Sequence, residues 1–352
     1  MLEIAIIGCG RIAANHIAAI KKIDGARIAA VCDHTEPKVQ KFAAELGCKG
    51  YTDAETMFKE SKIDAAIICV PTFVHEEYVK ICAKYGVAVL CEKPITRTTG
   101  ACERMIKAVK DSGIIFMAAQ VVRFWPGYVE IKKMMEKGEF GNVYMIRFRR
   151  VTSRDDAIAG WLNMPKQGGG AIHDMLVHDV DYLRYIGGPF ERCYANAIKD
   201  ETGCYNNVMA NIECKNGIRA MAEASFTMQT GYPFSFSISI IGSEATLEYD
   251  YHAGIRIADT DEEESRFRIW RKGKGLEEPE IEYGDAFERQ MRYFLDCVKN
   301  KKYPTLITPD ESFEVIHLVD ALHESAHSGQ AIKIDEYEGF DFRADREKYG
   351  KQ

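Results

Sequence analysis

The sequence predicts an α/β protein of two domains, the first built on a doubly wound parallel sheet and the second on an open, mostly antiparallel sheet. Three observations carry this prediction: short apolar runs that alternate with helical patterns up to about residue 120, a glycine-rich turn after the first run, and successive strand-like runs further on. A chain of 352 residues suits two domains, which we place at residues 1–120 and 121–352.

The first domain is predicted from nearly continuous apolar runs, as expected for parallel strands that are buried on both faces. We expect its strands at residues 4–7, 28–32, 65–70, 87–91 and 114–118. The segments between these runs fit helices that cover both faces of the sheet.

The turn after the first strand reads Gly8-Cys9-Gly10-Arg11-Ile12-Ala13. Gly8 permits the tight turn, Gly10 lets the backbone approach a pyrophosphate, and Ala13 lets the following helix pack closely on the strand. The helix N-terminus offers free N–H groups and a partial positive charge to the phosphates. This order predicts a Rossmann-type dinucleotide site that includes Gly8, Gly10, Arg11, Ile12 and Ala13. The alternative is a glycine turn that binds nothing.

An acidic residue ends the second strand and indicates the cofactor. Asp33 lies 23 residues after Gly10, where a carboxylate accepts hydrogen bonds from the adenosine ribose hydroxyls. Its charge would also repel a 2′-phosphate, so the pattern favours NAD. NADP remains the alternative, because His34 or Lys38 can approach a 2′-phosphate.

Glu92-Lys93-Pro94 follows a buried strand and therefore lies at the carboxyl edge of the sheet, where open α/β sheets bind ligands. A lysine there can point its ammonium group at a substrate oxygen and at the nicotinamide end of the cofactor. The alternative is an ordinary surface lysine. Pro94 is expected to fix the turn and allows a cis peptide after Lys93.

Val70-Pro71-Thr72 ends the preceding strand in the same way, and we expect it to form a backbone wall for the ribose or the nicotinamide. His75 follows at the start of the next helix. It either contacts the cofactor or caps that helix, and the sequence does not favour one reading over the other.

Beyond about Gln120 the chain shows strands with no helices between them. Residues 143–148 look like a strand with one exposed face, and residues 234–240 alternate Phe or Ile with Ser, which gives one buried face. Asn216-Gly217 predicts a hairpin between two strands. Helices are expected at residues 171–186, 286–298 and 310–328, followed from about Tyr337 by a charged surface strap or loose tail.

A triple glycine, residues 168–170, precedes the expected helix 171–186 and either starts it sharply or lets the chain approach a ligand. In one continuous helix Asp174, His178 and Asp181 share a face, and a histidine near an acid is a natural proton-transfer pair. A metal site built from these three residues is less favoured, because all the ligands would come from one helix. A solvated charge pair is the second alternative.

Composition excludes several classes of protein. A net charge of −7 argues against nucleic acid as a partner, and no apolar run approaches the length needed to span a bilayer. Eleven cysteines without a C-x-x-C pair indicate a reducing compartment. The first strand begins by residue 4 and leaves no room for a signal peptide, so we expect a cytoplasmic protein.

Taken together, these motifs resemble the Gfo/Idh/MocA oxidoreductases. The resemblance covers nearly the whole chain and depends on the glycine turn, on Glu92-Lys93-Pro94, on Arg123-Phe124 and on Asp174-x-x-x-His178-x-x-Asp181 after Gly169-Gly170. It implies an N-terminal Rossmann domain and a C-terminal α/β domain whose open sheet packs against another subunit, giving a homodimer or homotetramer.

The resemblance also implies roles for individual residues. Lys93, Asp174 and His178 would surround the substrate carbinol, with His178 as the general base, Lys93 orienting and stabilising the same oxygen, and Asp174 hydrogen-bonding the substrate and tuning His178. Arg123 and Trp161 match positions that often shape the substrate or cofactor pocket. Leu176 departs from the family, which commonly has glycine there, and is expected to narrow the pocket or shift the helix.

The resulting prediction is a dehydrogenase that transfers hydride between NAD(P) and a secondary alcohol of a sugar, sugar acid or cyclic polyol. Two alternatives stay open. One is a member that retains its cofactor, either to oxidise and re-reduce sugars or to cleave glycosides through a transient ketone. The other is a sensor that binds NAD(H) without turnover.

Overall fold

The computed structural model of the protein describes residues 1–153, 160–253, 264–282 and 284–339. The chain folds into two compact units. The first contains Met1–Thr96, Ala101–Gly138 and Pro279–Phe313, and the second contains Arg97–Gly100, Glu139–Glu278 and the chain from Glu314 onward. The first unit thus includes chain from both sides of residue 120, and the domain bounds 1–120 and 121–352 stay a prediction. Most of the predicted charged tail lies outside the described residues.

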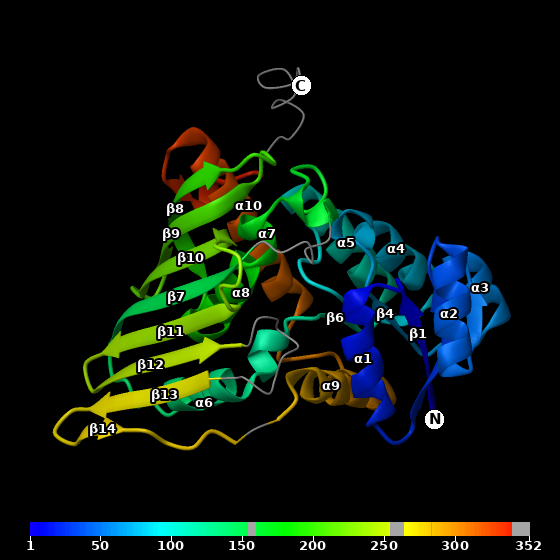
Figure 1. The fold of residues 1–352 in the computed structure, drawn as a ribbon, viewed down its shortest axis with the longest axis horizontal. Helices are drawn as coiled ribbons and strands as arrows, with labels where there is room; N and C mark the ends of the chain where they lie inside the picture. Colours follow the sequence, from blue (N-terminus) through cyan, green and yellow to red (C-terminus); the bar gives the residue numbers. More distant parts are fainter. Residues whose placement is uncertain (154–159, 254–263, 283, 340–352) are drawn as a thin grey trace. The chain divides into compact units, whose positions relative to one another are not determined.

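The first unit contains a six-stranded parallel sheet in the order β3-β2-β1-β4-β5-β6 (Figure 1). Its strands are β1 (Leu2–Ile7), β2 (Ala26–Cys32), β3 (Lys49–Tyr51), β4 (Ala65–Ile68), β5 (Ala88–Cys91) and β6 (Phe116–Ala118). The five predicted strands are confirmed because strands covered on both faces need apolar side chains throughout: every residue of β4 is fully buried. The short edge strand β3 carries no such pattern and was not predicted.

Helices lie along the chain between these strands and directly after the last of them. They are α1 (Arg11–Lys21), α2 (Glu36–Leu46), α3 (Ala54–Glu60), the short η1 (Thr72–Val74), α4 (His75–Tyr85), α5 (Thr99–Ser112), the short η2 (Val121–Phe124) and α6 (Pro126–Glu136). The late helix α9 (Ala286–Asn300) also belongs to this unit and packs against α1 and η2. Its first turn is capped by Asp285, which accepts hydrogen bonds from the N–H groups of Phe287 and Glu288.

The second unit contains a nine-stranded sheet in the order β14-β13-β12-β11-β7-β10-β9-β8-β15. Its strands are β7 (Val143–Ser153), β8 (Phe190–Lys199), β9 (Tyr205–Cys214), β10 (Arg219–Met228), β11 (Ser235–Gly242), β12 (Ala245–His252), β13 (Glu264–Arg271), β14 (Gly275–Glu277) and β15 (Ile332–Lys333). β7 and β10 are parallel, while the other neighbouring strands of the described sheet are antiparallel. The predicted hairpin at Asn216-Gly217 joins β9 to β10.

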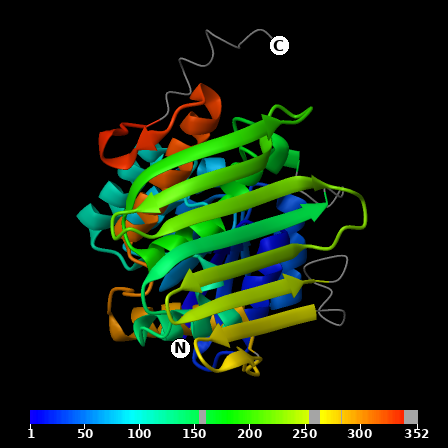
Figure 2. The ribbon, with the colours of Figure 1, turned by 90° about the vertical axis from the view of Figure 1, so that its left-hand side faces the viewer.

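The two faces of this sheet differ. The helices α7 (Ala171–Asp174) and α8 (Leu176–Gly187) pack on one face against β9 and β10. On β11, Ile238 and Ile240 are buried while Ser237 and Ser239 keep partial exposure, as the alternation predicts. Figure 2 looks onto the opposite face, which none of the described helices of the second unit covers.

One predicted helix is corrected. Residues 171–186 do not form a single helix, because the helical hydrogen bonding breaks at Met175, between α7 and α8. The N–H of His178 donates to Met175 O at 3.2 Å, three residues back instead of four. The predicted helices 286–298 and 310–328 are confirmed as α9 and α10 (Pro309–Ser328). The short helices η3 (Gly160–Asn163) and η5 (Ile334–Glu336) complete the second unit.

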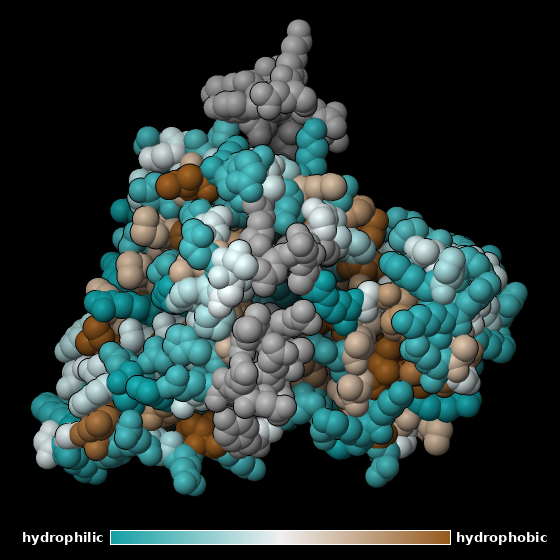
Figure 3. Space-filling view, viewed as in Figure 1, coloured by the Kyte–Doolittle hydropathy of each residue, from teal (hydrophilic) through white to brown (hydrophobic). Residues whose placement is uncertain are grey.

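No helix within the described residues is long and apolar enough to span a membrane. The face shown in Figure 3 is mostly hydrophilic and interrupted by small, separate hydrophobic groups.

Candidate functional site

The residues predicted to bind the cofactor lie at the carboxyl ends of β1, β2, β4 and β5 in the first unit. The strand order reverses between β1 and β4, which is the position where doubly wound sheets bind ligands. Gly8 occupies this point with a φ of 101°, and a Cβ there would lie 2.6 Å from the carbonyl carbon of Cys69. The protein itself therefore requires glycine at position 8, because β1 and β4 approach each other too closely for a side chain.

Gly10 differs from Gly8. Its φ of −97° is open to any residue, and a Cβ would meet only Cys69 O, at an ordinary 3.9 Å. Nothing in the protein requires glycine there, so the bare backbone leaves space for a ligand at the start of α1. Such a space beside free helix N–H groups fits the pyrophosphate of a dinucleotide.

The other residues of the glycine turn also fit the dinucleotide-binding fingerprint. Ala13 is fully buried, which lets α1 lie close to the sheet. Ile12 is half-buried and Arg11 is exposed at the first position of α1. The side chain of Arg11 is thus available at the helix end that would face phosphate.

Asp33 is buried directly after β2 and organises the turn. One carboxylate oxygen accepts the N–H of Cys9 at 2.8 Å, and the other accepts the N–H of Thr35 at 2.9 Å. Burial alone would raise the pKa of this carboxyl, but the backbone donors hold the pKa below its ordinary value. An ionised carboxylate at this position suits ribose hydroxyls and opposes a 2′-phosphate.

Glu92 and Lys93 follow β5, and the peptide between Lys93 and Pro94 is cis. Glu92 is buried: one carboxylate oxygen lies 2.7 Å from Nε2 of His16 on α1, and the other accepts the N–H of Lys93 at 3.0 Å. The Lys93 side chain keeps partial exposure. The sequence reasoning did not single out His16, because the buried face of α1 gave no sign of its partner.

His75 ties the turn after β4 to the turn after β5. Its Nε2 lies 2.8 Å from Val70 O and its Nδ1 lies 3.1 Å from Pro94 O. The ring makes no hydrogen bond that caps a helix, so the capping alternative is wrong. Burial lowers the pKa of His75. Pro71 and Val70 are partly exposed beside it, while Thr72 is buried.

Arg123 lies in η2 of the first unit and is 5% exposed. Its Nη1 donates to Leu306 O and lies 3.2 Å from a carboxylate oxygen of Glu311. In this structure the guanidinium joins η2 to the chain around α10. A role in the substrate pocket stays a prediction.

The other predicted site residues belong to the second unit. The triple glycine starts α7 sharply: Gly170 has a φ of 77°, and a Cβ there would lie 2.5 Å from Oδ1 of Asn206. The same Asn206 oxygen accepts the N–H of Ala171 at 2.9 Å and so caps the helix from a neighbouring strand.

The segment from Gly168 to Leu183 is buried except at two residues. Only Asp174 and His178 keep partial exposure within it. Asp181, predicted to share their face, is 1% exposed, because the break at Met175 and the packing of α8 place it in the interior. An aspartate and a histidine are thus the two partly exposed residues of an otherwise buried segment.

Leu176 and Trp161 complete the predicted set. Leu176 is fully buried at the start of α8, whereas Trp161 in η3 is half-buried. Within the described residues no group of three His, Cys, Asp or Glu side chains could hold a metal ion.

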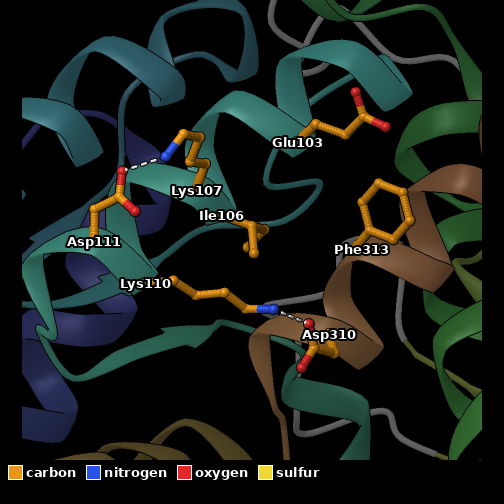
Figure 4. Close-up of a pocket in the computed structure, with 7 residues that line it drawn as sticks. All are labelled: Glu103, Ile106, Lys107, Lys110, Asp111, Asp310 and Phe313. Carbon is orange, nitrogen blue, oxygen red and sulfur yellow. Dashed lines mark hydrogen bonds and ion pairs between the residues drawn. The ribbon is translucent and has the colours of Figure 1, made fainter.

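A surface pocket of about 340 Å³ lies in the first unit between α5 and the start of α10 (Figure 4). It contains none of the predicted site residues. Its two lysines are paired with acids, Lys107 with Asp111 and Lys110 with Asp310. The pocket gives no indication of a ligand.

The fold and these residues define a dinucleotide-binding α/β protein whose second unit carries a partly exposed aspartate and histidine. The sequence model of the oxidoreductase family with NAD-binding Rossmann fold, GFO/IDH/MocA, matches residues 2–120, and that of the GFO/IDH/MocA C-terminal domain matches residues 128–248. The chain belongs to the GFO/IDH/MocA oxidoreductase family, and its first unit contains an NAD-binding Rossmann fold.

Individual relatives are distant but align over almost the full length. The chain is 27% identical to myo-inositol 2-dehydrogenase of Thermotoga maritima, over 96% of this chain and 100% of that protein. It is 25% identical to 2,7-anhydro-N-acetylneuraminate hydratase of Mediterraneibacter gnavus, over 95% and 97%. The solved structure of myo-inositol 2-dehydrogenase from Lactobacillus plantarum shares the fold, with a TM-score of 0.78 at 23% identity over 94% and 99% of the two chains.

Proposed function

We propose that this protein is an NAD-dependent dehydrogenase that oxidises a secondary alcohol of a cyclic polyol, sugar or sugar acid, or reduces the corresponding ketone. The observation that carries the proposal is the paired exposure of Asp174 and His178 in an otherwise buried segment. The similarity to a myo-inositol 2-dehydrogenase supports the substrate class.

In this proposal Lys93, Asp174 and His178 act on the same carbinol. His178 takes the hydroxyl proton as the C–H bond breaks, and the ammonium of Lys93 meets the negative charge that develops on the oxygen. Asp174 accepts a hydrogen bond from the substrate and favours the protonated form of His178. The bound nicotinamide would supply the hydride acceptor.

We propose Gly8, Gly10, Arg11, Ile12, Ala13 and Asp33 as the dinucleotide-binding set, with Val70, Pro71, Thr72, His75, Glu92 and Lys93 toward the nicotinamide. Arg123 and Trp161 are proposed to shape the pocket. Asp33 favours NAD over NADP because its ionised carboxylate, held in place by the N–H groups of Cys9 and Thr35, can accept ribose hydroxyls and repels a 2′-phosphate.

We further propose that two copies associate through the uncovered face of the nine-stranded sheet. Exposed apolar side chains project there from three strands that lie side by side: Met145 on β7, Met221 on β10 and Met209 on β9. Apolar groups gathered on an open sheet are typical of a subunit interface. A homodimer or homotetramer in sedimentation velocity would support this proposal, and a clean monomer would contradict it.

One relative favours a second function. A hydratase at 25% identity adds water with no net change in oxidation state. A member of this kind would retain its cofactor and regenerate it within each turnover. Cofactor that stays bound through gel filtration and is not consumed during product formation would favour this alternative.

The experiment that tests the main proposal offers NAD and then NADP to the purified protein with a panel of inositols, aldoses and sugar acids, and follows absorbance at the NADH band. A rise that disappears in Lys93→Ala and in His178→Ala supports the proposal. Lys59→Ala, a surface lysine in α3, serves as the matched control and should keep full activity. Unchanged turnover in both site variants would overturn the mechanism, whereas bound NAD(H) without any turnover would indicate a sensor.

A further inference from the structure

A buried histidine on α1 contacts the acid that precedes the proposed catalytic lysine. His16 is fully buried, and its Nε2 lies 2.7 Å from Oε1 of Glu92. The second carboxylate oxygen of Glu92 accepts the backbone N–H of Lys93 at 3.0 Å. Within the first unit, a continuous polar connection thus runs from α1 through Glu92 to the main chain of Lys93.

The two ring nitrogens of His16 have different surroundings. Its Nδ1 is buried and has no hydrogen-bond partner among the described residues, and the ring of Phe287 packs edge-on at 5.5 Å. An ionised carboxylate oxygen only accepts hydrogen bonds, so in this contact Nε2 of His16 carries the proton and donates it to Glu92.

Glu92 depends on this donor. Burial by itself raises the pKa of Glu92, but the hydrogen bond from His16 and the charges nearby bring the pKa below its ordinary value. The carboxylate stays ionised and keeps one oxygen for His16 and the other for Lys93. Without His16, a buried carboxylate oxygen would lose its partner, and the remaining bond to Lys93 would weaken.

The chain is also held on the other side of Lys93. Nδ1 of His75 lies 3.1 Å from Pro94 O and 3.3 Å from Ile95 O. Lys93 is thus fixed between two buried histidines from different helices, while its own side chain keeps partial exposure. Buried polar pairs are a weak source of stability compared with apolar packing, which points to geometry as the role of this one.

We infer that His16 is a positioning residue for Lys93 and acts through Glu92. The inference rests on the proposed function, in which the Lys93 ammonium meets the substrate oxygen. His16 lies outside the glycine fingerprint and outside the proposed catalytic residues. In this inference it helps to fix the position of the Lys93 ammonium group.

The test compares three variants of the full-length protein. His16→Leu removes the donor, His16→Gln keeps a donor at a similar reach, and Val39→Ala is the control, because it removes buried apolar volume from α2 and leaves the Glu92 contact in place. We expect His16→Leu to lower kcat by on the order of ten- to a hundredfold with little change in the KM for NAD. His16→Gln should recover most of this loss, and Val39→Ala should show none.

Two readouts separate positioning from general damage. In His16→Leu the acid limb of the kcat–pH profile should move to higher pH, because Glu92 loses the donor that lowers its pKa. Residue-resolved hydrogen exchange should show the Lys93 amide exchanging roughly tenfold faster in His16→Leu and at the wild-type rate in His16→Gln. The exchange measurement needs no substrate, so it stands even if the wild-type protein reduces no cofactor and the proposed function fails.

The inference is overturned if His16→Leu keeps the wild-type kcat and pH profile where turnover is measurable. It is equally overturned if the Lys93 amide exchanges at the wild-type rate in His16→Leu, or if Val39→Ala accelerates that exchange as much.

Discussion

Arg150 and Asp179 form a two-point ion pair in the interior of the second unit. Nη2 of Arg150 lies 2.7 Å from Oδ1 of Asp179, and Nε lies 3.2 Å from Oδ2. Arg150 stands on β7, the middle strand of the nine-stranded sheet, and Asp179 follows His178 on α8. The pair anchors the helix that presents the proposed general base, and sequence patterns did not reveal it.

The first prediction concerns this pair. Arg150→Ala should lower the free energy of unfolding by about 3–5 kcal/mol, because it leaves a buried carboxylate without its partner. Urea unfolding followed by circular dichroism measures the change. Arg219→Ala on the neighbouring β10 is the matched control: its partner Glu213 is solvent-accessible, so the loss should stay below about 1 kcal/mol. Equal losses of unfolding free energy in the two variants would contradict the role of the Arg150–Asp179 pair as an anchor of α8.

The two glycines of the cofactor turn should respond differently to alanine. Gly8→Ala should destabilise the protein by about 2 kcal/mol or more, because its φ is positive and its Cβ would strike the backbone of Cys69 and Val70, directly after β4. Gly10→Ala should keep stability within about 1 kcal/mol yet weaken NADH binding at least roughly tenfold. Thermal unfolding and NADH fluorescence titration check the two effects. Full NADH affinity in Gly10→Ala would contradict the proposed approach of the pyrophosphate.

Asp33 should control cofactor choice. In Asp33→Ser the ratio of kcat/KM with NADP to that with NAD should rise roughly tenfold or more, because the charge that repels a 2′-phosphate is gone. Steady-state kinetics with both cofactors measures this ratio. His34→Ala, exposed beside it, should leave an NAD preference in place. A wild-type preference for NADP would show that the reading of Asp33 is wrong.

Stability should fall with acid partly through His173. Burial, followed by the nearby Arg97 guanidinium, lowers the pKa of His173 to about 3. Below the ordinary histidine pKa the unfolded chain therefore binds a proton that the folded chain does not. The free energy of unfolding is highest above that pKa and decreases as the pH falls below it. The loss from His173 between pH 7 and pH 5 should be about 2 kcal/mol. In His173→Phe the free energy of unfolding, measured by urea unfolding at each pH, should fall by that much less between pH 7 and pH 5. An unchanged pH dependence would show that His173 does not contribute to the loss of stability in acid.

The cysteines should be inert in the native protein. None of the eleven is in a disulfide, and Cys48 alone among them is not buried. Burial raises the pKa of Cys9 and of Cys32 to about 12, which keeps both as unreactive thiols. A thiol reagent at pH 8 should modify at most one group quickly, and all eleven after denaturation. Fast labelling of Cys9 would show that the glycine turn opens more readily than its packing implies.

The sequence by itself determined the parallel sheet, the hairpin at Asn216-Gly217 and the glycine turn. It could do so because these features depend on local requirements: apolar residues along strands buried on both faces, and a positive φ or missing side chain at particular positions. Helical spacing also led to the pairing of Asp174 with His178, which stays a prediction because the two residues lie on separate helices, α7 and α8.

Only the tertiary structure decided which polar groups meet. His16 reaches Glu92 across 76 positions of the chain, and Arg150 reaches Asp179 across 29. It also placed the break at Met175 and buried Asp181, which helical periodicity alone had left beside His178. Such contacts depend on how whole elements pack, and no local pattern of residues encodes them.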